Sequence, residues 1–502
     1  MADPFYITTA ISYPNGKPHI GHAYEAIAAD VIARFQRAQG RDVRLVTGTD
    51  EHGLKMVQTA RGEGMETRAY ADKMSSYFKQ MCDDLGVSYD TFVRTTEPRH
   101  AAASVALWKA LETSGDLYLD RYEGWYSVRD EAFYDESELV DGEGGERLSP
   151  QGTPVEWTAE ETWFFRLSAY QQRLLDHYRD HPDFIQPDSR RNEVIRFVEG
   201  GLKDLSVSRT SFDWGVPVPG SPGHVMYVWV DALTTYMTGV GFPEREGDYD
   251  RFWPADIHLI GKDIVRFHAV YWPAFLMSAG LPLPKQVYGH GFLLARGGEK
   301  MSKSAGNVVD PMELAERFGV DNLRYFLMRE ISFGQDGSYS AEAIVARCNA
   351  ELANSFGNLA QRSLSMVFKN LGGVIPAPGA AEADRALLNK VAAACASLDK
   401  EFARLAFAQG LEEWMAAVFA CNAYVDEMAP WALRKTDPER MAAVLGTLVA
   451  AVRQLAIAVA PLIPSSIERL LAAIEAGANG AAIAQPVPIF PRLELPAEEQ
   501  PA

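Results

Sequence analysis

Apolar residues in the first fifty positions follow two different periods. Short apolar runs at residues 5–10 and 42–46 predict β-strands. Between them, apolar side chains recur every four residues on one face of a predicted helix, which Gly40 is suited to end; they are Ala23, Ile27, Val31 and Phe35. This order predicts a parallel, right-handed βαβ unit, which binds ligands beyond the carboxyl ends of its strands.

The pattern changes twice further along the chain. Residues 116–225 are rich in aromatic and turn residues, which interrupts the alternation of strands and helices and predicts an inserted domain. A buried strand at residues 257–260 restores the α/β pattern. Residues 341–485 contain alanine-rich amphipathic stretches and predict a helix bundle, and the Ala/Gly/Pro-rich sequence past Gly477 predicts a tail.

Candidate binding residues lie where the predicted strands end. The turn from Ala10 to His22 would aim backbone N–H groups and a positive helix end at an anion, with His19 and His22 at its mouth. Together with Glu25, these histidines could instead form a metal-binding helix face, or they could be ordinary surface residues. Asp50 follows the second strand and would reach the same crevice, unless it is a helix cap.

Two further groups of residues fit the same crevice. Trp229, Ala232 and Tyr236 are three and four residues apart, so one helical face would present an apolar slot. An ordinary core stripe is the alternative. His268 lies one helical turn beyond Ile264, just after the strand at residues 257–260.

The composition is that of a globular protein with several domains. Its 502 residues exceed a single core, and 47% are hydrophobic while 23% are charged. The N-terminus has no secretory signal pattern and no apolar run approaches membrane-spanning length, so we expect a cytoplasmic protein that contacts no membrane. Four cysteines without a C-x-x-C pair predict reduced thiols and argue against a cysteine zinc knuckle.

Two short motifs carry a family resemblance. His19-Ile20-Gly21-His22 and Lys300-Met301-Ser302-Lys303-Ser304, in this order, resemble the signature motifs of class I aminoacyl-tRNA synthetases. The chain resembles the methionyl-tRNA synthetases over nearly its whole length, including residues 205–209 and 214–219. The enzymes for leucine, isoleucine and valine carry a much larger editing insertion, and the cysteine enzyme uses zinc on cysteines that are absent here.

The resemblance implies a fold and a division into domains. It implies an α/β, Rossmann-like parallel-sheet catalytic domain, split by an inserted connective peptide and followed by an all-α anticodon-binding helix bundle. Relatives often bind zinc on cysteine knuckles in the insertion, but residues 126–131 and 142–152 contain no cysteine, so we expect no metal there. The expected segments are residues 1–115 and 226–290 for the catalytic domain, 116–225 for the insertion, 291–340 for the KMSKS stem-contact region, 341–485 for the bundle and 486–502 for a tail.

The resemblance also implies the substrates and their sites. Asp50 would pair with the ammonium group of methionine, and aromatic side chains would enclose the thioether. The implied methionine-binding residues are Ile11, Tyr13, Asp50, Trp229, Ala232, Tyr236, Ile264 and His268. The implied residues for ATP with Mg²⁺ are His19, Gly21, His22, Gly261, Lys262, Asp263 and Lys303, with His19, His22, Lys300 and Lys303 catalytic.

A nucleic-acid partner is implied as well. Asn358, Arg362 and Trp431 match the positions that read the anticodon of tRNA(Met), initiator and elongator. The net charge of −19 requires a localised basic track for this RNA. The chain ends before the dimerising module of some relatives, so we expect a monomer. The alternatives are a synthetase for another amino acid, an idle tRNA-binding homologue, and a metal hydrolase using His19, His22 and His52.

Overall fold

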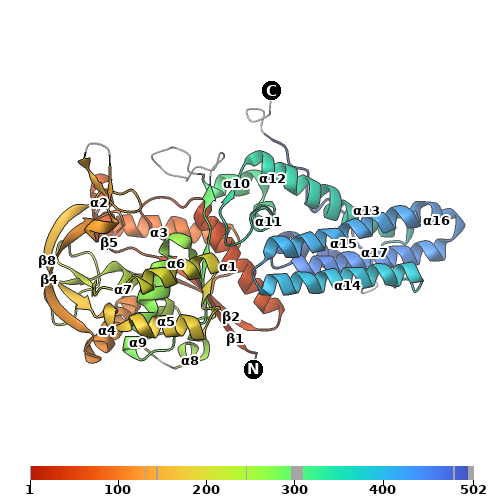
Figure 1. The fold of residues 1–502 in the computed structure, drawn as a ribbon. Helices are drawn as coiled ribbons and strands as arrows, with labels where there is room; N and C mark the ends of the chain where they lie inside the picture. Colours follow the sequence, from red (N-terminus) through yellow and green to blue (C-terminus); the bar gives the residue numbers. More distant parts are fainter. Residues whose placement is uncertain are drawn as a thin grey trace. The chain divides into compact units, whose positions relative to one another are not determined.

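The chain divides into two compact units, Met1–His290 and Gly291–Ala502 (Figure 1). The structure is a computed structural model, and it describes residues 2–130, 132–142, 145–244, 246–294, 309–478 and 481–495.

A six-stranded sheet organises the first unit, in the order β3-β2-β1-β13-β14-β9. Every neighbouring pair in it is parallel. The strand–helix–strand prediction for the N-terminus is confirmed, because β1 and β2 flank the helix α1 (Ile20–Ala38). The strands are β1 (Pro4–Thr9), β2 (Asp42–Thr49), β3 (Thr91–Arg94), β9 (Ile185–Gln186), β13 (Ile257–Gly261) and β14 (Val287–His290).

The order of the strands reverses direction between β1 and β13. These two strands pair in register from Ile7 opposite Ile257 to Thr9 opposite Leu259. In an open parallel sheet, ligands bind outside the carboxyl ends of the strands at such a reversal. The loops that leave β1, β2 and β13 therefore open on one crevice.

Helices cover the sheet and complete its core. Fully buried aromatic side chains from strands and helices pack in one cluster; examples are Tyr6, Trp108, Phe165, Tyr236 and Trp272. The principal helices are α2 (Leu54–Gly62), α3 (Thr67–Asp84), α4 (Pro98–Thr113), α7 (Val228–Thr238) and α9 (Trp272–Ala279). The helix α7 contains the predicted apolar slot.

The predicted insertion is only partly separate from the parallel sheet. Its four-stranded antiparallel sheet has the order β10-β8-β4-β5 and is built on the long pair β4 (Leu117–Ser127) and β8 (Glu156–Phe165). The remaining two strands are β5 (Ala132–Tyr134) and β10 (Leu205–Ser206). Between β8 and β10, however, the chain forms α5 (Gln171–Asp180), β9 and α6 (Asp188–Glu199), and β9 pairs with β14. Part of residues 116–225 therefore forms an edge of the parallel sheet. The sequence did not predict this, because β9 has only two residues.

The second unit is predominantly helical, as the sequence predicts for residues 341–485. The helices α14 and α15 lie beside each other, and α17 packs against α13, α14 and α18 (Figure 1). The elements are α10 (Pro311–Phe318), α11 (Val320–Glu330), α12 (Ala341–Cys348), the π-helix η6 (Asn349–Gly357), α13 (Asn358–Asn370), α14 (Glu382–Ala403), α15 (Phe407–Met428), α16 (Pro430–Thr436), α17 (Pro438–Val459) and α18 (Pro464–Ala478). β15 (Leu293–Leu294), which precedes these helices, pairs with β16 (Gly337–Ser338), which lies between α11 and α12.

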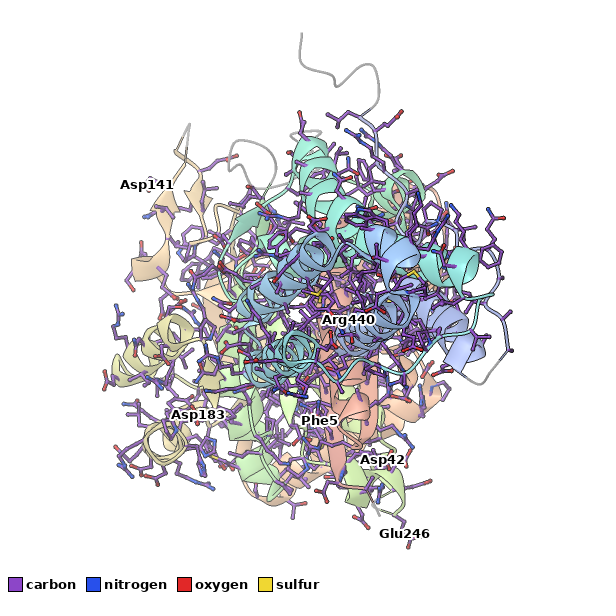
Figure 2. The ribbon with its side chains drawn as sticks, turned by 90° about the vertical axis from the view of Figure 1, so that its right-hand side faces the viewer. Phe5, Asp42, Asp141, Asp183, Glu246 and Arg440 are labelled. Atoms are coloured by element: carbon purple, nitrogen blue, oxygen red, sulfur yellow. The ribbon has the colours of Figure 1, made fainter. Side chains whose placement is uncertain are left out.

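An ion pair with a buried carboxylate joins two of these helices. Arg440 on α17 donates two hydrogen bonds, of 2.5 and 2.7 Å, to the carboxylate of Asp384 on α14. Figure 2 shows Arg440 surrounded by the helices of this unit. The side chain of Asp384 is fully buried, and both the pair and the hydroxyl of Tyr424 satisfy its oxygens. The bundle is thus joined by polar as well as apolar contacts.

The expectation that no apolar run approaches membrane-spanning length is wrong for α17. Among the described residues, this one helix of 22 residues is long and apolar enough to cross a membrane. However, 61% of its most apolar 18-residue stretch is buried inside the structure. Its apolar residues face α13, α14 and α18, so they form the core of the bundle.

Residues 481–495, the described part of the chain beyond α18, pack against the helices of the second unit without forming a helix or strand there. Ile483 and Phe490 are buried. The side-chain amide of Asn349 donates to the carbonyl of Leu493 (2.9 Å), and the N–H of Leu493 donates back to that side chain (2.8 Å). The segment at residues 486–495 is therefore held in place.

Candidate active site

The turn before α1 is organised by its two histidines. His19 is the N-cap of the helix, and its Nδ1 accepts the backbone N–H of Gly21 (3.1 Å). The Nδ1 of His22 accepts the backbone N–H of His19 in return (3.1 Å). A Cβ at position 21 would lie 2.9 Å from the His19 ring, so glycine is the residue that permits this cap.

This reciprocal cap determines which ring nitrogens carry hydrogen. Because each Nδ1 accepts a backbone N–H, the neutral form of each ring has its hydrogen on Nε2. The centroids of the two rings are 3.8 Å apart, and the ring planes are tilted by 33° to each other. The start of α1 therefore places two neighbouring imidazole N–H groups at the positive end of a helix, which is an arrangement suited to phosphate oxygens.

The two metal-site alternatives, which used His19 and His22 with Glu25 or with His52, have no complete set of ligands among the described residues. Among residues 2–130, 132–142, 145–244, 246–294, 309–478 and 481–495, no group of three His, Cys, Asp or Glu is placed to hold a metal ion. Glu25 instead accepts a hydrogen bond from Nε2 of His290 (2.8 Å), and His52 donates to Asp231 (2.5 Å). The four cysteines are free thiols, as predicted.

The loop that leaves β2 lies beside the turn that leaves β1. The N–H of Ser12 donates to Gly48 (3.0 Å), and the N–H of Asp50 donates to the carbonyl of Ser12 (2.9 Å). These bonds bring the segment from Ile11 to Tyr13 alongside Asp50, as the sequence analysis expects for two loops of one crevice. Asp50 is only 9% exposed, so its carboxylate is a buried negative charge at this edge.

After the turn before α1 and the loop after β2, the third side of the crevice is formed by α7 and the residues that follow β13. Tyr236 donates its hydroxyl to Nε2 of His268 (2.6 Å), and Nδ1 of His268 donates to the carbonyl of Ile264 (2.9 Å). The ring of Trp229 stands edge-on to His268 at 6.0 Å and stacks on Phe267 at 3.8 Å. The predicted slot residues are thus brought together, and Ala232 lies buried in the same helix.

Burial determines the protonation of this side of the crevice. It lowers the pKa of His268 from 6.5 to about 4, so the ring is neutral at physiological pH. Burial also raises the pKa of Tyr236 well above 10, and the nearby charges of Glu25 and Asp50 add to that rise. Tyr236 therefore stays a hydroxyl donor.

A buried carboxylate connects the β2 loop to α7. Asp231 receives hydrogen bonds from His52 (2.5 Å) and from Nε2 of His100 (2.7 Å). Burial alone would raise the pKa of Asp231, but these two histidines outweigh it and hold the pKa below its usual range. The loop that carries Asp50 is consequently tied to the helix that carries Trp229 and Tyr236.

The sequence predicted Glu25 only as a metal ligand in the alternative interpretation of the two histidines, and it predicted no role for Phe267. Glu25 lines a small pocket with His22, Ser12 and Thr47. Burial raises its pKa, the hydrogen bond from His290 opposes that rise, and the charge of Asp263 adds to it. The sequence could have indicated this position, because Glu25 lies three residues after His22 and therefore on the same face of α1. Gly261, Lys262 and Asp263 end β13 and begin the short helix η4 (Lys262–Ile264) at the same edge.

Two further groups of residues were predicted from the sequence. Lys300 and Lys303 fall in residues 295–308, outside the described residues. In the second unit, Asn358 and Arg362 lie one turn apart on α13, and the guanidinium of Arg362 is 5.9 Å from the ring of Trp431. Trp431 is 52% exposed, so it is a surface residue and not part of the core.

A cluster of hydroxyl groups surrounds Asp130 at the end of the inserted sheet. The Oδ2 of Asp130 accepts hydrogen bonds from Ser149 (2.7 Å), Thr153 (2.6 Å) and Tyr134 (3.1 Å). Ser127 and Thr153 also bond each other at 2.7 Å. These hydrogen bonds cross-link this part of the insertion.

Comparisons with known proteins agree with the geometry. Residues 5–364 match the family described as tRNA synthetases class I (M), and residues 375–485 match the anticodon binding domain of methionyl tRNA ligase. The methionine–tRNA ligase of Brucella suis is 56% identical over 513 residues, covering 99% of each chain. That of Mycobacterium tuberculosis strain H37Rv is 53% identical over 515 residues, covering 98% of each.

A solved structure is similar throughout. The crystal structure of M. tuberculosis methionyl-tRNA synthetase bound by methionyl-adenylate superposes with a TM-score of 0.94 at 52% identity, covering 97% of this chain and 100% of that one. With two family matches, more than half of its residues shared with these enzymes and the same fold, the chain belongs to the methionyl-tRNA synthetases, the class I enzymes that join methionine to tRNA.

Proposed function

We propose that the crevice at the carboxyl ends of β1, β2 and β13 binds methionine and ATP side by side and forms methionyl-adenylate there. The observation that carries this proposal is the convergence of three loops on one edge: the histidine cap of α1, the buried Asp50, and the Tyr236–His268 pair. A phosphate-binding helix end, an ammonium-binding carboxylate and an aromatic slot are the parts that this reaction needs.

Methionine would bind with its charged end at Asp50 and its thioether among the aromatic rings. A carboxylate pairs with the ammonium group, and sulfur contacts to Trp229 and Tyr236 are favourable. His268, neutral and hydrogen-bonded to Tyr236, presents no charge to the thioether. Ile11, Tyr13, Ala232 and Ile264 would complete the slot. Such a pocket discriminates against a ligand shorter by one methylene by only about 1–3 kcal/mol.

ATP, carrying Mg²⁺ as part of the substrate, would bind with its phosphates at the start of α1. The Nε2–H groups of His19 and His22 would donate to phosphate oxygens, and Gly21 allows the backbone to approach. Gly261, Lys262 and Asp263 would hold the nucleoside, with Asp263 at the ribose hydroxyls. Lys300 and Lys303 would neutralise the departing pyrophosphate.

The chemistry requires positioning more than proton transfer. The methionine carboxylate attacks the α-phosphorus in line, the bond to the bridging oxygen breaks, and pyrophosphate leaves with that electron pair. Since a carboxylate is already a nucleophile, no general base is needed. The enzyme contributes orientation and donors at the oxygens where negative charge grows.

The helical unit would select the tRNA. Trp431 would stack on an unpaired anticodon base while Arg362 and Asn358 bond to base edges. The terminal adenosine of tRNA(Met), initiator or elongator, then takes the methionyl group from the adenylate. We also propose that the chain acts in the cytoplasm as a monomer without zinc and without membrane contact. The domain limits given above are proposed as well, except that β9, within residues 116–225, belongs to the parallel sheet.

Exchange of labelled pyrophosphate into ATP tests this function without tRNA. Methionine, leucine, isoleucine, valine and cysteine are compared in parallel, and we expect strong exchange with methionine alone. Exchange with another amino acid would keep the reaction and overturn the pocket. Absence of exchange with all five would favour the idle tRNA-binding homologue.

A further inference from the structure

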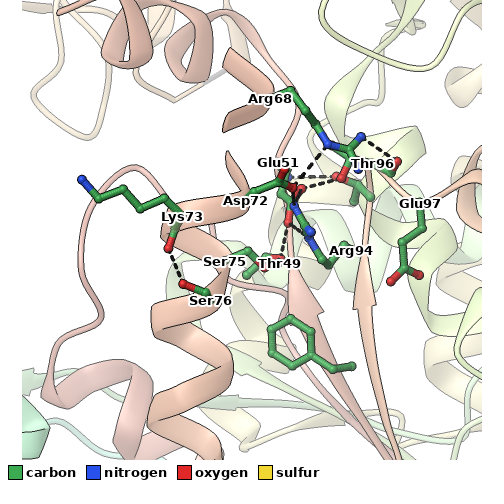
Figure 3. A network of polar contacts seen from close by, with 12 residues as sticks. Thr49, Glu51, Arg68, Asp72, Lys73, Ser75, Ser76, Arg94, Thr96 and Glu97 are labelled. Atoms are coloured by element: carbon green, nitrogen blue, oxygen red, sulfur yellow. Dashed lines mark hydrogen bonds and ion pairs between the residues drawn. The ribbon is translucent and has the colours of Figure 1, made fainter. Parts of the chain in front are cut away.

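The residue after Asp50 is one of the most completely bonded side chains of the first unit. Glu51 is fully buried. Its Oε1 accepts hydrogen bonds from Nε of Arg94 (2.6 Å) and from the hydroxyl of Thr49 (2.7 Å). Its Oε2 accepts from Nη2 of Arg94 (2.8 Å) and from the hydroxyl of Thr96 (2.6 Å). Figure 3 shows Glu51, Arg94 and Thr96 meeting at one point beside Thr49.

The backbone of Glu51 is held as firmly as its side chain. Its N–H donates to the hydroxyl of Thr95 (2.9 Å), and its carbonyl accepts the indole N–H of Trp214 (2.6 Å). Thr95, which donates its own N–H to the carbonyl of Thr49 (3.2 Å), is fully buried too. Every polar atom of Glu51 therefore has a partner, which is how a buried charge avoids a large desolvation cost.

These bonds determine the direction of the neighbouring side chain. Where backbone is extended, alternate side chains lie on one side and the residue between them lies on the other. The side chains of Thr49 and Glu51 touch, so Asp50 faces away from them. Arg94 extends the connection by bonding Asp72 on α3, so the loop is joined to both β3 and α3.

We propose that Glu51 is a positioning residue that holds the carboxylate of Asp50 toward the ammonium group of methionine. This inference rests on the proposed role of Asp50. Glu51 itself touches no substrate. Its buried pair with Arg94 keeps the loop in one arrangement, so that no methionine binding energy is spent on ordering Asp50.

The test measures binding of methionine, ATP and the methionine analogue that lacks the amino group, by calorimetry on the full chain. Glu51→Gln keeps the shape of the side chain and removes its charge. We expect methionine to bind about tenfold more weakly, the size of one lost charge-assisted hydrogen bond, and ATP and the deaminated analogue to bind as before. Weakening of all three ligands alike would mean that Glu51 has only a structural role and would overturn the proposal.

Three further variants keep the test decisive. Thr96→Val removes one hydrogen bond to Glu51 and leaves Arg94 in place. We therefore expect a smaller loss of methionine affinity, again without an effect on the other two ligands, and this variant serves even if Glu51→Gln fails to fold. Arg94→Lys keeps the positive charge but not the paired hydrogen bonds. We expect it to weaken methionine binding more than Thr96→Val and less than Glu51→Gln. Arg68→Ala is the matched control, because Arg68 bonds Asp72 (3.3 Å) and the backbone carbonyl of Thr96 (3.2 Å) but does not bond Glu51 (Figure 3).

A double-mutant cycle separates this proposal from the role of Asp50. In an Asp50→Asn background, we expect Glu51→Gln to have no additional effect on methionine binding. If Asp50→Asn alone leaves methionine binding unchanged, the proposed role of Asp50 fails. If Asp50→Asn weakens binding and Glu51→Gln does not, or if the two effects simply add, only the positioning role of Glu51 fails.

Discussion

His19 combines a structural and a chemical task in one ring, because it caps α1 within the turn that we propose binds ATP. Asparagine is a strong N-cap without an imidazole. We expect His19→Asn to unfold in urea within about 0.5 kcal/mol of the native chain while pyrophosphate exchange falls roughly 10²-fold. His19→Ala loses the cap as well and costs about 1 kcal/mol of stability. Normal exchange by the asparagine variant would remove the ring from catalysis.

His268 makes stability depend on pH in a defined direction. Burial lowers its pKa from 6.5 to about 4, so below pH 6.5 the unfolded chain binds a proton that the folded chain does not bind until about pH 4. Stability therefore falls as the pH falls through this window. We expect the stability difference between the native chain and His268→Gln, measured by urea unfolding, to shrink by about 2 kcal/mol from pH 7 to pH 4.5. A constant difference would contradict this.

Individual side chains were predictable from the sequence to different degrees. The spacing of Trp229 and Tyr236 along α7 predicted a shared face, and the structure joins Tyr236 to His268. The stacking of Phe267 on Trp229 was not predictable, because Phe267 begins a π-helix that ends at Tyr271 and departs from the 3.6-residue period. The bonds of Glu51 depend on β3 and on Trp214, far away in sequence.

The inserted sheet is stabilised at its end by the hydroxyl groups around Asp130. We expect Asp130→Ala to leave Ser149 and Thr153 without their acceptor and to destabilise residues 127–153 locally by about 1–3 kcal/mol. Hydrogen exchange with mass spectrometry measures this. Asp141→Ala is the control, because Asp141 is an exposed carboxylate of the same segment that pairs with Arg147 (3.4 Å) instead of the hydroxyl groups (Figure 2). A chelator should leave the protection of the segment unchanged. Loss of protection with the chelator would reveal a structural metal.

Long elements were predictable and very short ones were not. Four-residue spacing sufficed for α1, and alanine-rich amphipathic stretches sufficed for the helices of the second unit. The strand β9 has two residues, and its place at the edge of the parallel sheet depends on the backbone of β14, which the local sequence does not show. The π-helix η6 is likewise set by tertiary packing, with Leu352 and Phe356 buried.

At the scale of the whole molecule, activation of methionine and recognition of tRNA are assigned to different units. We expect Trp431→Ala to leave pyrophosphate exchange unchanged and to raise the KM for tRNA in aminoacylation about tenfold or more, since stacking on one base contributes about 1–3 kcal/mol. Phe419→Ala is the matched control, because Phe419 is a similarly exposed aromatic in the same unit (56% against 52%). Equal loss in both reactions would show that Trp431 stabilises the bundle instead.

The pairing of β1 with β13 has a consequence for how the protein is made. These neighbours are separated by about 250 residues of chain, as the bond between the N–H of Tyr6 and the carboxylate of Asp256 shows. A ribosome has therefore delivered more than half of the polypeptide before the central strands can meet. Until then one edge of β1 has no partner strand, so the nascent chain passes through a long stage in which that edge is open to aggregation.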